Sequence, residues 1–126
     1  MIFDTDILIF IQKRHQKAIH LFEITEQRAI SVQTYMELLQ SANNRQQQKY
    51  VLDFIKKSNT IILPLTENIG HRASIYIEQF DISHGLRTGD ALIAATAVEN
   101  VMTLCSANRK HFQMIKELDF KSFKVS

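Results

Sequence analysis

Two patterns of apolar residues alternate along this chain. Short continuous runs predict buried β-strands, and longer segments with apolar residues every three or four positions predict amphipathic helices. The run TIILPL is the clearest strand, continuous and β-branched as expected for the centre of a sheet. The predicted strands are 1–3, 29–32, 60–65, 101–105 and 120–125; the predicted helices are 6–12, 15–27, one carrying Tyr35, Met36, Leu38 and Leu39, 46–57, 67–80, one headed by Asp90, and 108–118.

Strands separated by helices indicate right-handed crossover connections and a mostly parallel sheet. The segment 91–98 is entirely small or apolar, so the helix that it forms must be covered nearly all round. We therefore expect an α/β fold, a three-layer α/β/α domain with a central, mostly parallel sheet. With 126 residues, the chain is long enough for one such domain over 1–126 and short for two.

Composition narrows the class of protein only slightly. The hydrophobic fraction is 45%, the charged fraction 22% and the net charge +2, values that are ordinary for a globular protein and compatible with a nucleic-acid ligand. Cys105 is the only cysteine, which excludes an intramolecular disulfide and a cysteine zinc site and favours a cytoplasmic setting. No stretch reaches the roughly 20 apolar residues of a membrane span, so no membrane is expected.

Carboxylates stand near the predicted junctions between strands and helices. Asp4 follows the first strand, Glu37 lies in the helix after the second, and Asp90 heads a helix that leads into the fourth. Asn108 and His111 follow the fourth strand. Because the carboxyl ends of parallel strands open on one rim, where ligands bind in such folds, we expect these side chains to lie close together.

Three carboxylates on one rim repel one another unless a cation lies between them. Oxygen ligands without a cysteine indicate Mg²⁺ or Mn²⁺, which can orient a phosphodiester and activate water. Each acid alone also has an ordinary explanation. Asp4 could cap a helix, the helix dipole could favour Asp90 at the start of its helix, and Glu37 could lie on a solvated helix face.

The segments that hold these acids resemble one known family. MIFDTDILIF is similar to the first strand and acid of PIN-domain ribonucleases of the VapC toxin type, and ISVQTYMELL resembles their second motif, with the glutamate on Glu37. GLRTGDALIAATA is similar to their most specific signature, with the acid on Asp90, and LCSANRKHF resembles the fourth motif. The resemblance runs nearly from end to end.

This resemblance implies a Mg²⁺-dependent endoribonuclease, a homodimer restrained by a cognate antitoxin. It assigns metal binding and catalysis to Asp4, Glu37 and Asp90. The supporting positions that follow from it are Thr5, Asp6, Ser106, Asn108 and His111. Many family members have an aspartate in the last motif, where this chain has His111. The number of metal ions is therefore open, and Asp6 could partly compensate.

Basic residues close to the predicted rim could hold RNA phosphates, which fix position without reading sequence. Solvated helix ends explain them equally well. The candidates are Lys13, Arg14, Arg87, Arg109 and Lys110.

Two other functions compete with the nuclease. FDTDIL resembles the Asp-x-Asp motif of haloacid-dehalogenase-type phosphatases, but Gly89-Asp90 has no second acid after it and the chain is short for that fold. The second alternative is a PIN-like module that binds RNA or protein without cutting. The presence of Asp4, Glu37 and Asp90 together argues against it.

Overall fold

The computed structural model describes all residues, 1–126, and contains one five-stranded sheet in which every pairing is parallel. The strand order is β3-β2-β1-β4-β5. The strands are β1 Ile2–Phe3, β2 Ala29–Ser31, β3 Ile61–Leu63, β4 Leu104–Ser106 and β5 Phe120–Ser122.

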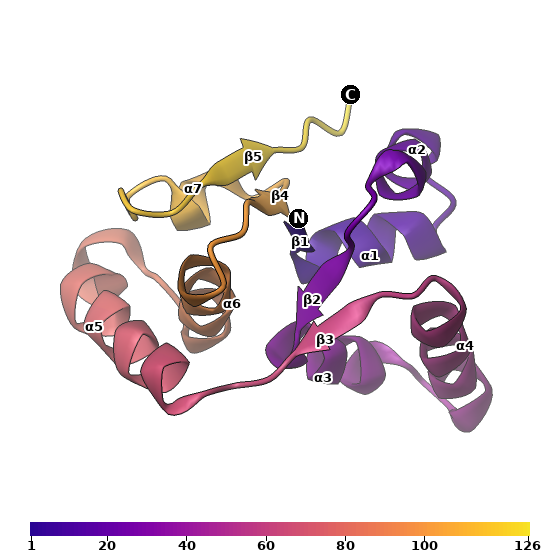
Figure 1. Ribbon diagram of the computed structural model, residues 1–126, viewed down its shortest axis with the longest axis horizontal. Coiled ribbons are helices and arrows are strands. Elements are labelled where there is room, and N and C mark those ends of the chain that lie inside the picture. Colours follow the sequence, from indigo (N-terminus) through magenta and orange to yellow (C-terminus); the bar gives the residue numbers. More distant parts are fainter.

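Helices fill every connection between the strands and cover both faces of the sheet. In Figure 1, α5 and α6 lie to the left of the strands, and α1, α2 and α4 lie to the right. The helices are α1 Thr5–Gln12, α2 Gln16–Ile24, α3 Val32–Ser41, α4 Arg45–Lys57, α5 Glu67–His84, α6 Thr88–Glu99 and α7 Arg109–Phe112. The predicted α/β/α architecture is confirmed.

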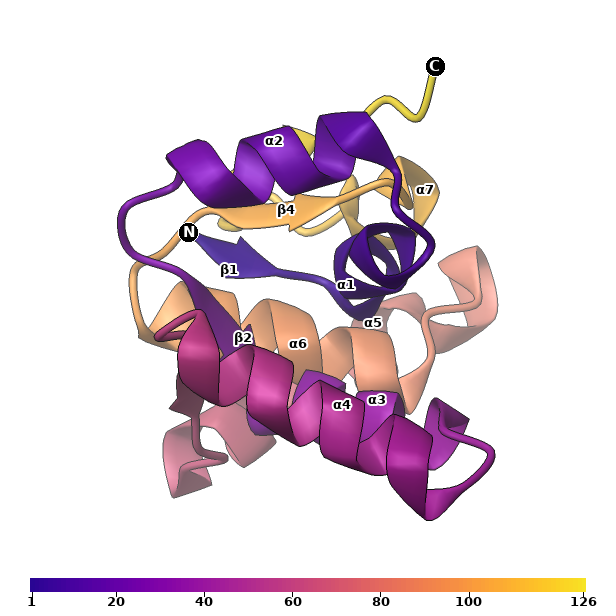
Figure 2. The ribbon, with the colours of Figure 1, turned by 90° about the vertical axis from the view of Figure 1, so that its right-hand side faces the viewer.

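Alternation along the strands divides the core into two halves. Ile2 and Leu104 pack with α5, α6 and α7 on one face, whereas the next residues, Phe3 and Cys105, pack with α1 to α4 on the other. This is the two-residue period of a strand that is buried on both faces. Figure 2 shows β1 and β4 pointing toward the same end of the molecule, where α1 and α7 lie.

The helix α6 is covered on nearly all sides, as its apolar sequence predicts. Ala91 and every residue from Ile93 to Ala97 are buried. The preceding helix α5 packs against it and ends at Gly85, whose φ of 65° is a left-handed conformation that glycine adopts without strain.

The prediction that 60–65 is a central strand is wrong, because β3 lies at an edge of the sheet. Ile61 and Ile62 remain 56% and 36% exposed. An apolar, β-branched sequence indicates that a segment forms a strand. It does not indicate whether that strand is central, because burial of its two faces depends on the helices and strands that pack around it. This edge is consequently an unpaired, apolar one.

Two other boundaries differ from the predictions. Only Arg109–Phe112 of the predicted helix 108–118 is helical, and turns follow it. The fourth strand begins at Leu104 rather than at residue 101, because Val101 has a left-handed φ of 53° that ends the preceding turn. The remaining elements agree within a few residues.

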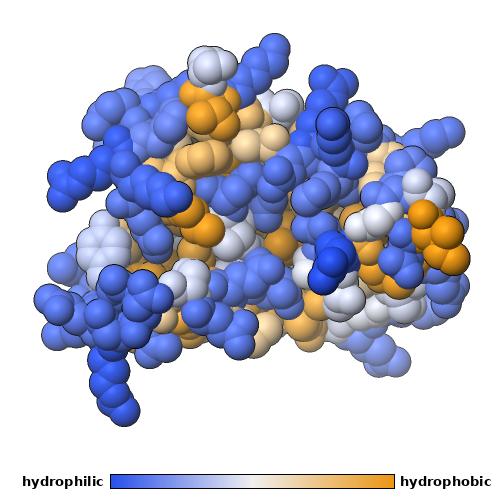
Figure 3. Space-filling view, turned by 180° about the vertical axis from the view of Figure 1, so that it is seen from behind, coloured by the Kyte–Doolittle hydropathy of each residue, from blue (hydrophilic) through white to orange (hydrophobic).

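Figure 3 shows that charged and polar side chains cover most of the face opposite to that of Figure 1, with hydrophobic side chains in separate patches. No helix has the length and apolar character needed to cross a membrane.

Candidate active site

Asp4 lies directly after β1 and is buried, with 5% of its surface exposed. Its Oδ1 accepts a hydrogen bond from the N–H of Thr5 at 2.7 Å and caps the start of α1. Its Oδ2 accepts from the hydroxyl of Ser106, at the end of β4, also at 2.7 Å. Oδ1 of Asp4 therefore caps a helix, as the ordinary explanation expects, while Oδ2 contacts another predicted site residue.

Asp6 faces the loop that joins β4 to α7. Its Oδ2 accepts from the backbone N–H of Ala107 at 2.9 Å and from Asn108 Nδ2 at 3.3 Å, and it lies 3.4 Å from Ser106 Oγ. The N–H of Asn108 in turn donates to Ser106 Oγ at 3.0 Å. Four of the predicted positions, residues 4, 6, 106 and 108, thus belong to one hydrogen-bonded group.

Glu37 comes from the middle of α3 and joins this group through Thr5. The Thr5 hydroxyl donates to Glu37 Oε1 at 2.5 Å. On its other side Glu37 lies against Gly89, where an added Cβ would stand 3.1 Å from Oε2. The absence of a side chain at Gly89 therefore allows the glutamate to lie beside the start of α6. Glu37 is half-buried by these contacts and does not lie on a freely solvated face.

Asp90 occupies the first turn of α6, a position that the helix dipole also favours. Its Oδ2 lies 3.4 Å from Nδ1 of His111, whose side chain is half exposed. His111 belongs to α7, so this contact brings the fourth motif to the third acid. His111, which takes the place of the last acid in the resembled motif, thus lies beside the acidic group.

The carboxylates raise one another's proton affinity. Burial raises the pKa of Asp4 to about 7, helped by the negative charges of Asp6 and Asp90 and opposed by the hydrogen bonds from Ser106 and Thr5. Burial also raises the pKa of Asp90, with a further contribution from Glu37 and an opposing one from His111. These mutual effects show that acids distant in sequence share one electrostatic environment.

Burial likewise raises the pKa of Asp6, against the hydrogen bond donated by Ala107. The other oxygen of this carboxylate, Oδ1, is buried without a hydrogen-bond partner. None of Asp4, Asp6, Glu37 and Asp90 forms an ion pair with a lysine or arginine. The group thus carries negative charge that no lysine or arginine pairs with, which is costly at buried positions.

A divalent cation would supply that balance, and carboxylate and hydroxyl oxygens are the donors that Mg²⁺ and Mn²⁺ prefer. As they are placed, no three His, Cys, Asp or Glu side chains form a group that could hold a metal ion. The donor chemistry and the unbalanced charge fit such an ion, and the ligand set remains a prediction.

The five predicted RNA-contacting side chains are all exposed. Arg87 precedes α6, and Arg109 and Lys110 begin α7, so these three flank Asp90 and His111 in the chain. Lys13 and Arg14 follow the far end of α1, about 12 Å from Asp4 along an eight-residue helix. The first three are therefore better placed for a ligand at the acids than the last two.

Two polar residues of this region were missed by the sequence reasoning. Thr34 is buried, with its hydroxyl 3.1 Å from that of Thr5, and an added Cβ at Gly89 would stand 3.2 Å from Gln33 Nε2. Gln33 and Thr34 precede Glu37 by about one helical turn, so all three lie on the same face of α3. This spacing is the sequence signal that predicts their place beside Glu37.

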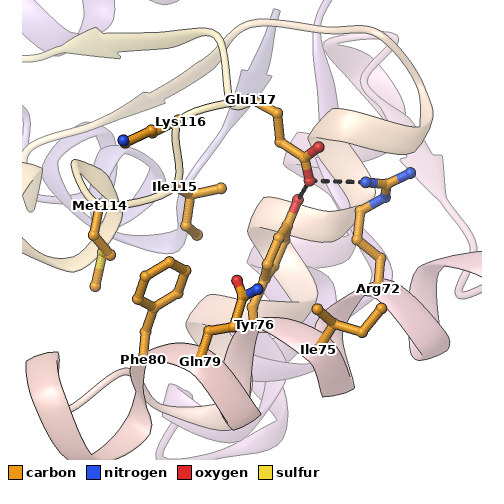
Figure 4. Close-up of a pocket in the computed structure, with 9 residues that line it drawn as sticks. All are labelled: Arg72, Ile75, Tyr76, Gln79, Phe80, Met114, Ile115, Lys116 and Glu117. Atoms are coloured by element: carbon orange, nitrogen blue, oxygen red, sulfur yellow. Dashed lines mark hydrogen bonds and ion pairs between the residues drawn. The ribbon is translucent and has the colours of Figure 1, made fainter.

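A separate pocket of about 470 Å³ lies between α5 and the segment after α7 (Figure 4). In it, the hydroxyl of Tyr76 and the guanidinium of Arg72 both donate to the carboxylate of Glu117, and Arg72 also pairs with Glu99. None of the predicted site residues lines this pocket. Its glutamate is paired with an arginine and a tyrosine, so the pocket differs from the acidic group in composition and charge balance.

Comparison with known proteins identifies the family. The sequence model of the PIN domain matches residues 1–118, so the chain belongs to the PIN-domain family. No curated protein sequence matches the chain.

Solved structures of similar fold span almost the whole chain. A toxin–antitoxin complex from Klebsiella pneumoniae contains a chain with 25% identity and a TM-score of 0.77, over 99% of this chain and 97% of that one. A chain of VapBC2 from Rickettsia felis, bound to a DNA fragment from its promoter, has 21% identity and a TM-score of 0.78, over 98% of this chain and 100% of that one. A chain of VapBC-1 from nontypeable Haemophilus influenzae has 23% identity and a TM-score of 0.78, over 97% of this chain and 98% of that one. The fold is that of chains found in VapBC complexes.

Proposed function

We propose that this PIN-domain protein is a metal-dependent endoribonuclease that acts as the toxin of a toxin–antitoxin pair. The observation that carries this proposal is the acidic group itself. Asp4 lies directly after β1, Glu37 comes from the middle of α3 and Asp90 from the first turn of α6, and none of them has a lysine or arginine partner. The charge of Asp90 raises the pKa of Asp4, and that of Glu37 raises the pKa of Asp90. Such an arrangement is costly for stability and suits a site that binds a divalent ion and a phosphodiester.

Asp4 and Asp90 would hold the ion directly, and Glu37 would complete the ligand set directly or through water. A bound Mg²⁺ or Mn²⁺ would supply Lewis-acid polarisation of the phosphodiester and a more acidic water. The nucleophile is water in this proposal, because the protein offers no activated alternative. Burial raises the pKa of the Cys105 thiol to about 11, and the Ser106 hydroxyl already donates to Asp4.

RNA would be held by the exposed cations beside the acids, first Arg87, Arg109 and Lys110, through contacts to phosphates. Lys13 and Arg14 would reach only a longer segment of the substrate. Single-stranded RNA is the expected substrate, since its backbone can enter a site lined by both carboxylates and cations without strand separation.

A non-catalytic RNA- or protein-binding module remains the second candidate. The replacement of an acid by His111 in the last motif favours it, and the presence of the other three acids opposes it. The phosphatase alternative is set aside, because the chain belongs to the PIN-domain family.

Toxicity has a direct cellular test. We expect induced expression of the protein to arrest growth, co-expression of the product of a neighbouring gene to relieve the arrest, and the Asp90→Asn variant to be harmless at equal abundance. Unaffected growth in the presence of folded protein that cuts RNA would contradict the toxin role and leave the nuclease intact. The similar chains in VapBC complexes support an antitoxin as the relieving partner.

A homodimer is also part of the proposal, and the β3 edge of the sheet is its best-supported interface. Exposed Leu52 lies beside Ile62 there, and exposed Leu65 follows Ile61 and Ile62 in the chain. This edge has no charged residue between Thr60 and Leu65. A short strand followed by Pro64 limits the addition of another strand, so a partner would instead cover the exposed apolar side chains of this edge.

Ile61→Lys should therefore convert a dimer into a monomer, as measured by light scattering after gel filtration. Burying a lysine in an apolar interface without a partner is unfavourable. Ile24→Lys is the matched control, since Ile24 is similarly exposed, at 62%, but lies on α2. A monomeric wild-type protein, or a dimer that only the control disrupts, would refute this interface.

A further inference from the structure

We propose that Asp6 is a positioning residue, which fixes the loop between β4 and α7 and does not hold the metal ion. This inference rests on the proposed nuclease function and concerns the same site. It addresses a choice that the sequence leaves open, namely whether Asp6 compensates for the acid that His111 replaces.

The hydrogen bonds of the Asp6 carboxylate are concentrated on Oδ2 and on one loop, whereas its other oxygen, Oδ1, is buried and has almost no surface open to an ion. Oδ2 accepts from Ala107 N at 2.9 Å and from Asn108 Nδ2 at 3.3 Å, and Ser106 Oγ lies 3.4 Å away. Asp6 lies in the first turn of α1, a rigid element, and the three residues that it contacts are consecutive. The carboxylate thus ties the start of α1 to the whole turn that leaves β4.

This turn carries two groups of the candidate site. At its beginning the hydroxyl of Ser106 donates to Asp4 Oδ2, and Asn108 N donates to the same hydroxyl, which sets its direction. Beyond it, α7 places His111 Nδ1 at 3.4 Å from Asp90 Oδ2. A shift of the turn would therefore move the partners of both Asp4 and Asp90.

The role described by these contacts needs an oxygen acceptor and not a negative charge. All the groups that approach Oδ2 are neutral donors, and no lysine or arginine pairs with Asp6. The amide oxygen of an asparagine can accept the same bonds, and its NH₂ group then takes the buried place of Oδ1, which makes no hydrogen bond in the wild type either. A metal ligand, in contrast, would lose much of its affinity when its charge is removed. The two roles thus give opposite expectations for one substitution.

Asp6→Asn and Asp6→Ala separate them. We expect Asp6→Ala to lower kcat for RNA cleavage by about 10- to 100-fold and Asp6→Asn to stay within about threefold of the wild type. The affinity for Mn²⁺, titrated by calorimetry, should stay within about threefold of the wild type in Asp6→Asn and fall further in Asp6→Ala, which frees the turn that holds the partners of Asp4 and Asp90. Amide exchange at Ala107 should become at least about tenfold faster in Asp6→Ala and remain near the wild-type rate in Asp6→Asn.

The inference is overturned if Asp6→Asn impairs cleavage and Mn²⁺ binding as much as Asp6→Ala does, because charge would then be required. It is also overturned if exchange at Ala107 is unchanged in Asp6→Ala. Asn108→Ala removes one donor to Oδ2 and gives a milder test if Asp6→Ala does not fold. A wild-type protein that neither binds Mn²⁺ nor cuts RNA would refute the proposed function, whereas the exchange measurement would still report on Asp6.

Discussion

Asp90→Asn is expected to abolish RNA cleavage, with a loss of at least about a hundredfold in the presence of Mg²⁺ or Mn²⁺. The substitution preserves the shape of the side chain and removes the charge that would hold the ion. Folding should not suffer, because burial already raises the pKa of Asp90 and makes its charged form unfavourable. The measurement is cleavage of labelled single-stranded RNA alongside a thermal unfolding curve.

Asp81→Asn is the matched control, since Asp81 is an exposed acid of α5 outside the candidate site. This variant should cut RNA at the wild-type rate. Cleavage by Asp90→Asn at that same rate would exclude the proposed site. Equal RNA binding by the wild type and by Asp90→Asn, with no cleavage by either, would establish the binding module instead.

The metal-free protein should lose stability as the pH rises from about 4 to about 7. The pKa of Asp4 is about 7 in the folded protein, above its ordinary value of 3.8, so the folded state holds a proton that the unfolded state has released in this range. The free energy of unfolding then falls by about 1.4 kcal/mol per pH unit, or on the order of 4 kcal/mol in all. Above pH 7 this contribution is constant.

Asp4→Asn should remove most of that decline, and the difference between variant and wild type isolates Asp4 from the other acids. Denaturant unfolding in the presence of a chelator, at several pH values, gives the comparison. Adding Mn²⁺ at pH 8 should raise the stability of the wild type and leave Asp4→Asn almost unchanged, because an ion that binds only the folded state stabilises it. A wild-type stability that rises relative to the variant between pH 4 and 7 would contradict the argument.

The order of strands and helices could be predicted because each element carries its own periodicity. The position of β3 could not, since Ile61 and Ile62 have the sequence of a buried strand and lie at an edge. The order of the strands across a sheet depends on which strands pair with each other. No single strand's sequence determines this, because pairing depends on the whole chain.

The candidate site divides in the same way. Asp4 and Asp90 were found from their places at helix starts, a local signal that the structure reproduces. The link from Thr5 to Glu37 and the approach of Glu37 to Gly89 depend on how α3 packs against α1 and α6, and no local pattern reports it. The position of His111 after the fourth strand predicted that it lies on the rim, and the resemblance of its motif to a family identified the acid that it replaces.

Asp4 caps a helix with one oxygen and accepts from Ser106 with the other, and these two roles bear on how the proposed activity could be lost. Asparagine caps helices as well as aspartate does, so it would keep the fold while removing the charge. The codons for the two residues differ by a single base. If the proposed toxin role holds, one base change could therefore remove the activity of this protein and leave its fold, and the surface that a restraining partner binds, intact.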